Sequence, residues 1–188
     1  GSSFDSVATL LAAYPSHFAI RTQSDVLALL GDIAWQARCG VTWNGATAEL
    51  VYLSKEPTGS VLALDAVTGE EGGLSLSTTG IEDIVTVFTA EWQPNYSDEK
   101  PKKVVYQTNV ARYGKREETF ELWIYQQRSL VVKSASFWAA RRGRAWRTAS
   151  SAMWGLEALH VDPLDYVRWD ISGFFNAVYC LVDRAGMS

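Results

Sequence analysis

Apolar residues recur at helical spacing in two segments near the start of the chain. Residues 5–13 fit a short helix, which Pro15 ends soon afterwards. Residues 25–39 fit a longer helix that Ser24 can cap and that Gly40 follows. The apolar stripe of this second helix consists of Val26, Leu27, Leu30, Ile33, Ala34 and Ala37. The pattern therefore predicts two helices, of which the second has one apolar face.

The next segment has the pattern of a β-hairpin. Asn44 and Gly45 separate two β-prone stretches, and this dipeptide favours a two-residue turn because both positions need a positive φ. We expect the hairpin over residues 41–53. The Gly-, Ser- and Thr-rich residues 54–80 then mark a boundary, so residues 1–78 are expected to form a small α/β subdomain.

Strand patterns dominate the remaining part of the chain, residues 79–188. Residues 129–142 are an exception, because their apolar positions make a helical stripe and Gly143 follows the last of them. The predicted strands cover residues 83–92, 104–111, 117–128, 145–154, 164–171 and 174–183, with a polar loop over 93–103. These patterns predict an α+β fold whose second part is rich in strands.

The strand predicted over residues 117–128 has apolar side chains on both faces. One face carries Phe120, Leu122 and Ile124. The other face carries Trp123 and Tyr125. A strand with two apolar faces is packed on both sides, and one of these sides can be an interface. We therefore expect Trp123 and Tyr125 to lie at a contact with another subunit.

The composition of the 188 residues limits the classes of function. Hydrophobic residues make up 47% and charged residues 20%, a balance that supports a packed core. The net charge of -4 does not favour nucleic-acid binding, because phosphate neutralisation needs clustered Lys and Arg. One basic cluster can be the solvated end of a helix or an inter-subunit contact. It consists of Arg141, Arg142, Arg144 and Arg147. No apolar run reaches the ~18 residues of a membrane span.

The sequence contains no residue pattern typical of a catalytic or metal site. Neither His17 nor His160 belongs to a metal-binding spacing. Cys39 and Cys180 are far apart and are interpreted as free buried thiols. The neighbouring acids are interpreted as turn and surface residues. These are the pairs Glu117–Glu118 and Asp162–Asp165. We therefore predict no catalytic residue, no cofactor and no metal, and a protein that is not an enzyme.

Two other functions stay open at this point. Trp43, Trp92 and Tyr96 lie beside predicted turns or loops, where aromatic rings can stack on the sugars of a host surface. A cell-wall-degrading enzyme would need two carboxylates across a cleft, which adjacency in the sequence cannot reveal. Core or interface positions are the commoner place for such rings.

Several short motifs follow one another along the chain. Residues 29–34 read Leu-Leu-Gly-Asp-Ile-Ala, residues 109–117 read Asn-Val-Ala-Arg-Tyr-Gly-Lys-Arg-Glu, and residues 159–167 read Leu-His-Val-Asp-Pro-Leu-Asp-Tyr-Val. Together with the helix of residues 129–142, their order and spacing resemble the hub proteins at the tip of phage tails and of related contractile injection machines. The second motif is similar to a Ser-x-x-x-Tyr-Gly-x-Arg stretch of these hubs, with Asn109 where Ser is more usual.

The resemblance implies a fold, a set of partners and a location. Residues 79–188 would form an antiparallel β-barrel with one helix packed against it. Three chains would form a homotrimer whose barrels make a pseudo-sixfold ring between the tail tube and the distal spike or fibre. The partners would be tube, spike or fibre subunits. The protein would be made in the bacterial host cytoplasm and would lie in the virion tail. The expected contact residues are Trp123, Tyr125, Arg141, Arg142 and Arg144.

Overall fold

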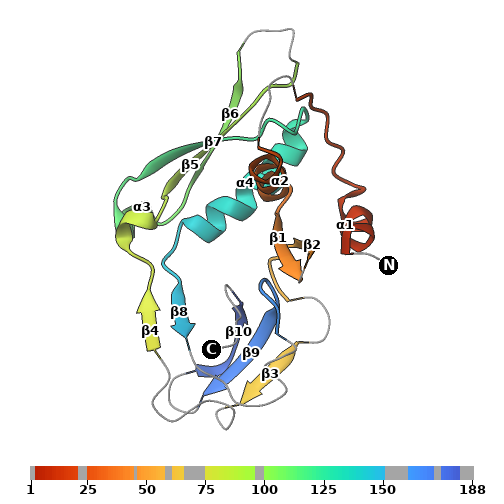
Figure 1. The fold of residues 1–188 in the computed structure, drawn as a ribbon. Coiled ribbons are helices and arrows are strands. Elements are labelled where there is room, and N and C mark those ends of the chain that lie inside the picture. Colours follow the sequence, from red (N-terminus) through yellow and green to blue (C-terminus); the bar gives the residue numbers. More distant parts are fainter. Residues whose placement is uncertain are drawn as a thin grey trace. The chain divides into compact units, whose positions relative to one another are not determined.

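The chain folds into two compact units, each built from two separate segments. The computed structural model describes residues 3–20, 25–44, 46–57, 61–65, 75–95, 100–150, 161–171 and 175–182. Unit 1 combines residues 1–52 with residues 79–146, and unit 2 combines residues 53–78 with residues 147–188. Both units are drawn in Figure 1. Helices and strands both occur, so the predicted α+β class is confirmed.

The units differ from the contiguous domains 1–78 and 79–188 that the sequence predicted. The chain changes unit at residue 79, where the sequence placed its boundary, but residues 1–52 pack with residues 79–146. The physical reason is that the second helix ends inside the protein. Its terminal carbonyl groups find their hydrogen-bond donors in side chains much later in the sequence.

Four elements of unit 1 precede its three-stranded sheet in the sequence. They are α1 (Ser3–Leu11), α2 (Val26–Gln36), β1 (Cys39–Asn44) and β2 (Thr47–Tyr52). Asp25 caps α2, because its Oδ1 accepts a hydrogen bond from the N–H of Leu27 at 2.8 Å. The predicted cap, Ser24, lies outside the described residues. Antiparallel pairing of Asn44 with Thr47 confirms the hairpin, but Asn44 is the last residue of β1 and not the first residue of the turn, as the sequence predicted.

A three-stranded sheet and a long helix form the larger part of unit 1 (Figure 1). The elements are η2 (Ile81–Asp83), β5 (Val87–Trp92), β6 (Lys102–Gln107), α3 (Val110–Tyr113), β7 (Glu117–Glu121) and α4 (Arg128–Arg142). Tyr106 pairs with Phe88, and its hydroxyl donates to the carbonyl of Val132 in α4 at 3.3 Å. This face of the sheet is therefore turned towards α4. The helix predicted over residues 129–142 is confirmed.

The described strands do not form the single antiparallel barrel that was expected for residues 79–188. They form separate small sheets, and no closed barrel is found among them. In unit 2, β9 (Tyr166–Ile171) pairs with β10 (Phe175–Leu181) and with β3 (Leu62–Asp65), while β8 (Arg147–Ser150) pairs with β4 (Ser75–Thr78). Two pairings, β3 with β9 and β5 with β7, are parallel. Strands from both halves of the sequence thus share sheets, which the linear pattern did not reveal.

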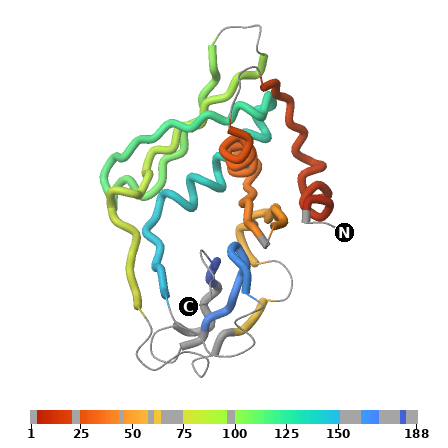
Figure 2. The backbone as a smooth tube through the Cα atoms, in the orientation of Figure 1, coloured from red at the N-terminus to blue at the C-terminus, as the bar shows by residue number. Residues whose placement is uncertain are grey.

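The connection from β6 to β7 passes the start of β5, and Thr86 holds it there. Thr86 is fully buried, and its hydroxyl donates to the carbonyl of Gly114 at 2.7 Å. The same oxygen accepts a hydrogen bond from the N–H of Arg116 at 2.8 Å. Gly114 has a φ of 78°, a conformation that favours glycine. Figure 2 traces this route, which brings β7 parallel to β5.

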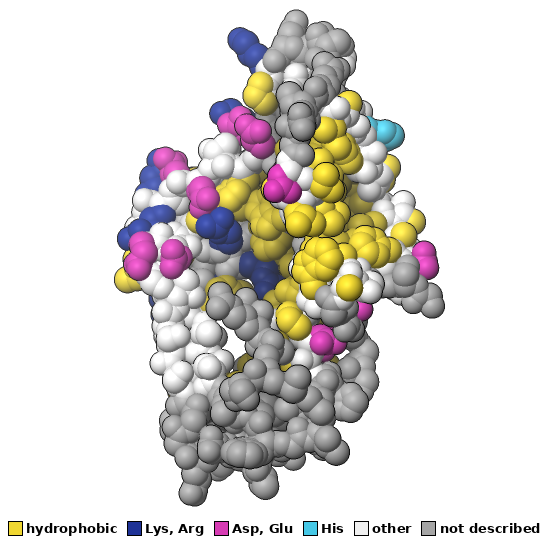
Figure 3. Space-filling view, in the orientation of Figure 1, with side chains coloured by type: hydrophobic (Ala, Val, Ile, Leu, Met, Phe, Trp, Pro, Cys, Tyr) yellow, Lys and Arg dark blue, Asp and Glu magenta, His cyan; other side chains and the backbone are white. Residues whose placement is uncertain are grey.

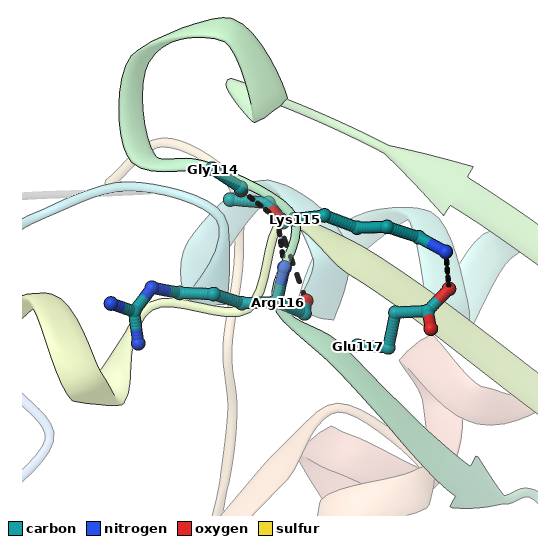
Figure 4. Close-up of polar contacts among 5 residues, drawn as sticks. Gly114, Lys115, Arg116 and Glu117 are labelled. Atoms are coloured by element: carbon teal, nitrogen blue, oxygen red, sulfur yellow. Dashed lines mark hydrogen bonds and ion pairs between the residues drawn. The ribbon is translucent and has the colours of Figure 1, made fainter.

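The turn after Gly114 also carries charged side chains at the surface. Figure 4 shows Lys115 reaching Glu117, with 2.8 Å between Nζ and Oε1, while the Arg116 guanidinium points away from them. Asn109 begins this segment at a φ of 55°, which Asn tolerates better than most residues. Its Nδ2 donates to the carbonyl of Gly143 at 2.7 Å, which joins the segment to the end of α4.

A buried polar cluster surrounds the last residue of α2. The carbonyl of Gln36 accepts hydrogen bonds from the hydroxyls of Tyr125, at 3.2 Å, and Ser134, at 2.7 Å. The side-chain Oε1 of Gln36 accepts from the N–H of Ile124 at 3.2 Å. The carbonyl of Trp35 accepts from the indole N–H of Trp138 at 3.0 Å. Carbonyls at a helix end lack partners within the helix, and these donors supply them.

Replacing Thr86 with Val keeps the shape of the side chain but removes the hydroxyl. The Gly114 carbonyl and the Arg116 N–H each lose a buried partner, so we expect the free energy of unfolding to fall by about 1–3 kcal/mol. Urea unfolding followed by circular dichroism measures the change. The control is Thr89→Val in β5, where the side chain is only half-buried. Equal losses in the two variants would contradict the role given to Thr86.

The two hydroxyls on the Gln36 carbonyl provide a second test of the fold. Tyr125→Phe or Ser134→Ala alone leaves the carbonyl with one donor, so each should cost about 1 kcal/mol of unfolding free energy. The double variant leaves it with neither and should lose more than the sum of the single losses. Chemical denaturation of the four proteins in the cycle measures this coupling. Additive losses would show that the two hydroxyls act independently.

Candidate functional site

Unit 1 has an open hollow of ≈ 400 Å³ at the edge of its sheet, which we call the aromatic hollow. It is lined by Asp32, Trp35, Thr119, Phe120, Glu121, Trp123 and Arg142. These residues come from α2, from β7 and the turn after it, and from the end of α4. Figure 3 shows hydrophobic side chains gathered over α2 and α4, with acidic and basic side chains beside them over β7. The hollow therefore combines aromatic rings with charges of both signs.

The aromatic rings of the hollow are braced by the core behind them. Trp35 stacks on Trp138 with ring centroids 4.8 Å apart and an interplanar angle of 15°. Phe120 stacks on the fully buried Phe88 at 4.2 Å and lies 5.5 Å from Trp35. Stacking of this kind holds large rings in one orientation. The hollow is thus formed before any partner binds.

Trp123 and Asp32 form the acidic end of the hollow. The indole N–H of Trp123 donates to Oδ2 of Asp32 at 2.8 Å, and Nε2 of Gln36 donates to the same oxygen at 3.2 Å. The ring of Phe18 meets Trp123 edge-on, with centroids 5.0 Å apart. Both donors are neutral, so they fix the carboxylate in place without cancelling its negative charge.

Arg142 forms the opposite end. Its Nη2 lies 3.2 Å from Oε2 of Glu118, and its Nη1 donates to Oε1 of the same residue at 3.4 Å. The guanidinium carbon lies 5.0 Å from the centroid of the Phe120 ring. The two-point geometry and the aromatic contact both orient the guanidinium.

The structure brings two of the predicted interface residues, Trp123 and Arg142, into one hollow. Two others, Arg141 and Arg144, meet at a different place. Their guanidinium carbons lie 5.4 Å and 4.2 Å from the ring centroid of Trp146, which is 40% exposed. We call Arg141, Arg144 and Trp146 the Trp146 ridge. It is a second surface, formed where α4 ends.

The prediction for Tyr125 is wrong. Its side chain is only 1% exposed, and its hydroxyl donates to a backbone carbonyl inside unit 1. The sequence predicted one strand over residues 117–128, with Tyr125 beside Trp123 on one face. Instead β7 ends at Glu121, and the N–H of Tyr125 donates to the carbonyl of Leu122 across a turn. The turn breaks the alternation and directs Tyr125 into the core.

Sequence reasoning missed the residues of α2 that line the hollow. Asp32 and Trp35 lie outside the apolar stripe of their helix, three residues apart, and so on the same side of it. A large aromatic ring away from the apolar stripe was the available signal. The sequence contains no comparable signal for Phe120 and Glu121, because these residues come close to α2 only in the folded chain.

The predicted sugar-stacking residues are not brought together. Trp92 is only 4% exposed, so its ring cannot serve as a platform for a sugar. Trp43 is 53% exposed and lies on the hairpin, away from the lining of the hollow. Tyr96 lies outside the described residues.

A second hollow, of ≈ 390 Å³, lies at the other edge of the same sheet, and we call it the basic hollow. Its lining consists of Trp92, Pro94, Lys102, Lys103, Gln126 and Arg128. Nζ of Lys103 lies 2.6 Å from Oε1 of Glu91 in the neighbouring strand. The basic hollow and the aromatic hollow therefore flank one sheet.

The candidate residues for chemistry lie at buried, surface and turn positions. Burial raises the pKa of the Cys39 thiol to about 12, and the nearby Arg38 charge lowers it only in part. Burial also raises the pKa of Cys180. His17 is exposed, and Oδ2 of Asp165 accepts from the N–H of Asp162 within a turn. His160 lies outside the described residues.

Two features are absent from the described ranges, a cluster of metal ligands and a helix that could cross a membrane. No group of three or more His, Cys, Asp or Glu residues there is arranged to hold a metal ion. Within the same ranges, no helix combines the length and apolar character that a membrane crossing needs. No protein-family model matches the chain, and no curated protein sequence matches it.

The raised pKa of Cys39 predicts low reactivity in the native protein. At pH 8 a thiol with a pKa of about 12 is a thiolate in roughly one molecule in ten thousand. In a Cys180→Ser variant, a thiol-specific disulfide reagent should label Cys39 very slowly, and labelling should become fast when urea unfolds the protein. Rapid labelling of the native variant would contradict the burial of this thiol.

Proposed function

We propose that the chain is a structural assembly domain, and that the aromatic hollow of unit 1 binds a neighbouring protein subunit. The observation that carries the proposal is the composition of the hollow, in which Trp35, Trp123 and Arg142 lie together at the surface. Trp and Arg dominate the binding energy of many protein interfaces. Rings that are already braced lose little freedom on binding, which favours affinity.

The geometry supports a protein partner better than a sugar. A sugar stacks on the open face of a ring, but Phe120 already has Phe88 stacked on it and Arg142 beside it. Trp35 likewise has Trp138 stacked on it. The charged groups of both signs that lie beside these rings suit the side chains and backbone of another subunit.

The assembly that we propose is a phage-type tail tip, in which the domain joins the tail tube to a distal spike or fibre. The support is the resemblance of the Asn109–Glu117 motif and of the motif order to tail hubs. In this chain the motif forms the crossover from β6 to β7, and the crossover places β7 beside the hollow. The partners would be tube, spike or fibre subunits, and the chain would act as a homotrimer in the virion tail.

The hollow can be tested with one pair of matched variants. Trp123→Ser should lower the yield of complex about tenfold when the chain is co-expressed with candidate tail-tube and spike proteins, because an anchoring ring is lost. Trp43→Ser removes an exposed ring that lies outside the hollow and should leave the yield unchanged. Loss of complex with both variants, or with neither, would contradict an interface at the hollow.

The location can be tested independently of any variant. Antibodies against the chain should label the distal end of tail particles under the electron microscope. Label on the capsid, along the tube, or nowhere on the particles would reject the tail-tip role.

A further inference from the structure

The two outer strands of the unit 1 sheet carry opposite charges at the same end. Lys103 on β6, Glu91 on β5 and Glu121 on β7 lie in one row across the sheet. Lys103 forms its ion pair with Glu91, but among the described residues no cation is paired with Glu121. Beyond this row, Lys102 and Arg128 line the basic hollow, while Asp32 lines the aromatic hollow.

Both outer strands also have backbone groups for which the described part of the chain supplies no partner. In the order β6-β5-β7, neither β6 nor β7 has a further described strand beside it. The carbonyl of Arg116 and the N–H of Leu122 bond towards β5 and its start, so even-numbered positions of β7 point inward. Peptide groups alternate along a strand, and those of Glu117, Thr119 and Glu121 therefore point outward. They can accept another strand.

The same alternation applies to β6. The N–H of Thr108 donates to the carbonyl of Thr86, so even-numbered positions again bond inward. The peptide groups of Lys103, Val105 and Gln107 point outward. Val105 is 53% exposed, an unusual position for a β-branched apolar side chain on an open edge. Burying it against another strand would be favourable.

We infer that β6 of one copy pairs with β7 of a second copy of this chain, so that the sheet continues between molecules. This inference rests on the proposed assembly function and names its partner. β6 and β7 run in opposite directions within one sheet, so the new pairing is antiparallel. If the rows of the sheet continue, Lys103 lies beside Glu121 of the next copy and Val105 beside its Thr119. The basic and aromatic hollows then meet at the same contact.

The contact is head-to-tail, because it joins two different edges. A pair of copies joined in this way still has one open edge at each end. Further copies can therefore add, and they form a ring if the chain of copies closes or a filament if it does not. Charges on edge strands commonly prevent unwanted pairing. Edges of like charge would repel further copies, whereas opposite charges in one row attract them and fix the register.

Charge reversal at the two ends of the row tests this pairing. Glu121→Lys alone places two lysines together at each contact, and Lys103→Glu alone places two glutamates together. Each should raise the dissociation constant for self-association about tenfold, measured by sedimentation over a range of protein concentrations.

Mixing the two variants is the matched control. Wherever a copy of one variant meets a copy of the other, the contact again joins a lysine to a glutamate, so the mixture should associate more tightly than either variant alone. High salt should weaken association of the unchanged protein, because it screens the attraction between the two edges.

A backbone variant provides a test that is independent of charge. Thr119→Pro removes an outward N–H from β7 and should abolish self-association, while circular dichroism checks that the fold is kept. A chain that stays monomeric at every concentration, or charge variants that associate as the unchanged protein does, would overturn the inference. Labelling at the tail tip, together with charge variants that associate normally, would contradict the edge pairing but not the tail-tip function. Edge pairing without label at the tail tip would contradict the tail-tip function but not the edge pairing.

Discussion

The buried end of α2 is the constraint on which unit 1 depends. A helix that ends inside a protein leaves carbonyl groups that must find donors. Tyr125, Ser134 and Trp138 supply them at Gln36 and Trp35, from segments about a hundred residues away in sequence. These bonds join the first 52 residues to the sheet and α4, and they explain why unit 1 is built from two separate stretches of chain.

The same helix end builds the candidate site. Docking of α2 places Trp35 against Trp138 and Asp32 against Trp123, and both contacts line the aromatic hollow. The crossover held by Thr86 contributes the other wall, because it brings β7 parallel to β5 and so to the edge of the sheet. Packing that stabilises the fold therefore also shapes the surface proposed to bind a partner.

The positions of the charged residues indicate more about possible partners than the net charge does. A net charge of -4 over 188 residues indicates little about partners. The row from Lys103 through Glu91 to Glu121 gives the sheet a direction, with a basic side and an acidic side. In the proposed assembly, such a sheet would join copies in one orientation only, which is what an ordered ring or filament requires.

The local sequence determined the elements that depend on local interactions, namely the helices and the hairpin. Helical spacing and the signals at helix ends predicted α1, α2 and α4 to within a few residues, and Asn44-Gly45 predicted the hairpin. The same reasoning placed Trp123 and Arg142 at a contact with another subunit, which stays a prediction. The tertiary structure alone decided the interleaved units, the parallel β7, the burial of Tyr125 and the meeting of Asp32 with Trp123. Each of these depends on groups far apart in sequence that satisfy one another's hydrogen bonds or bury one another's rings, and no local pattern records such pairs.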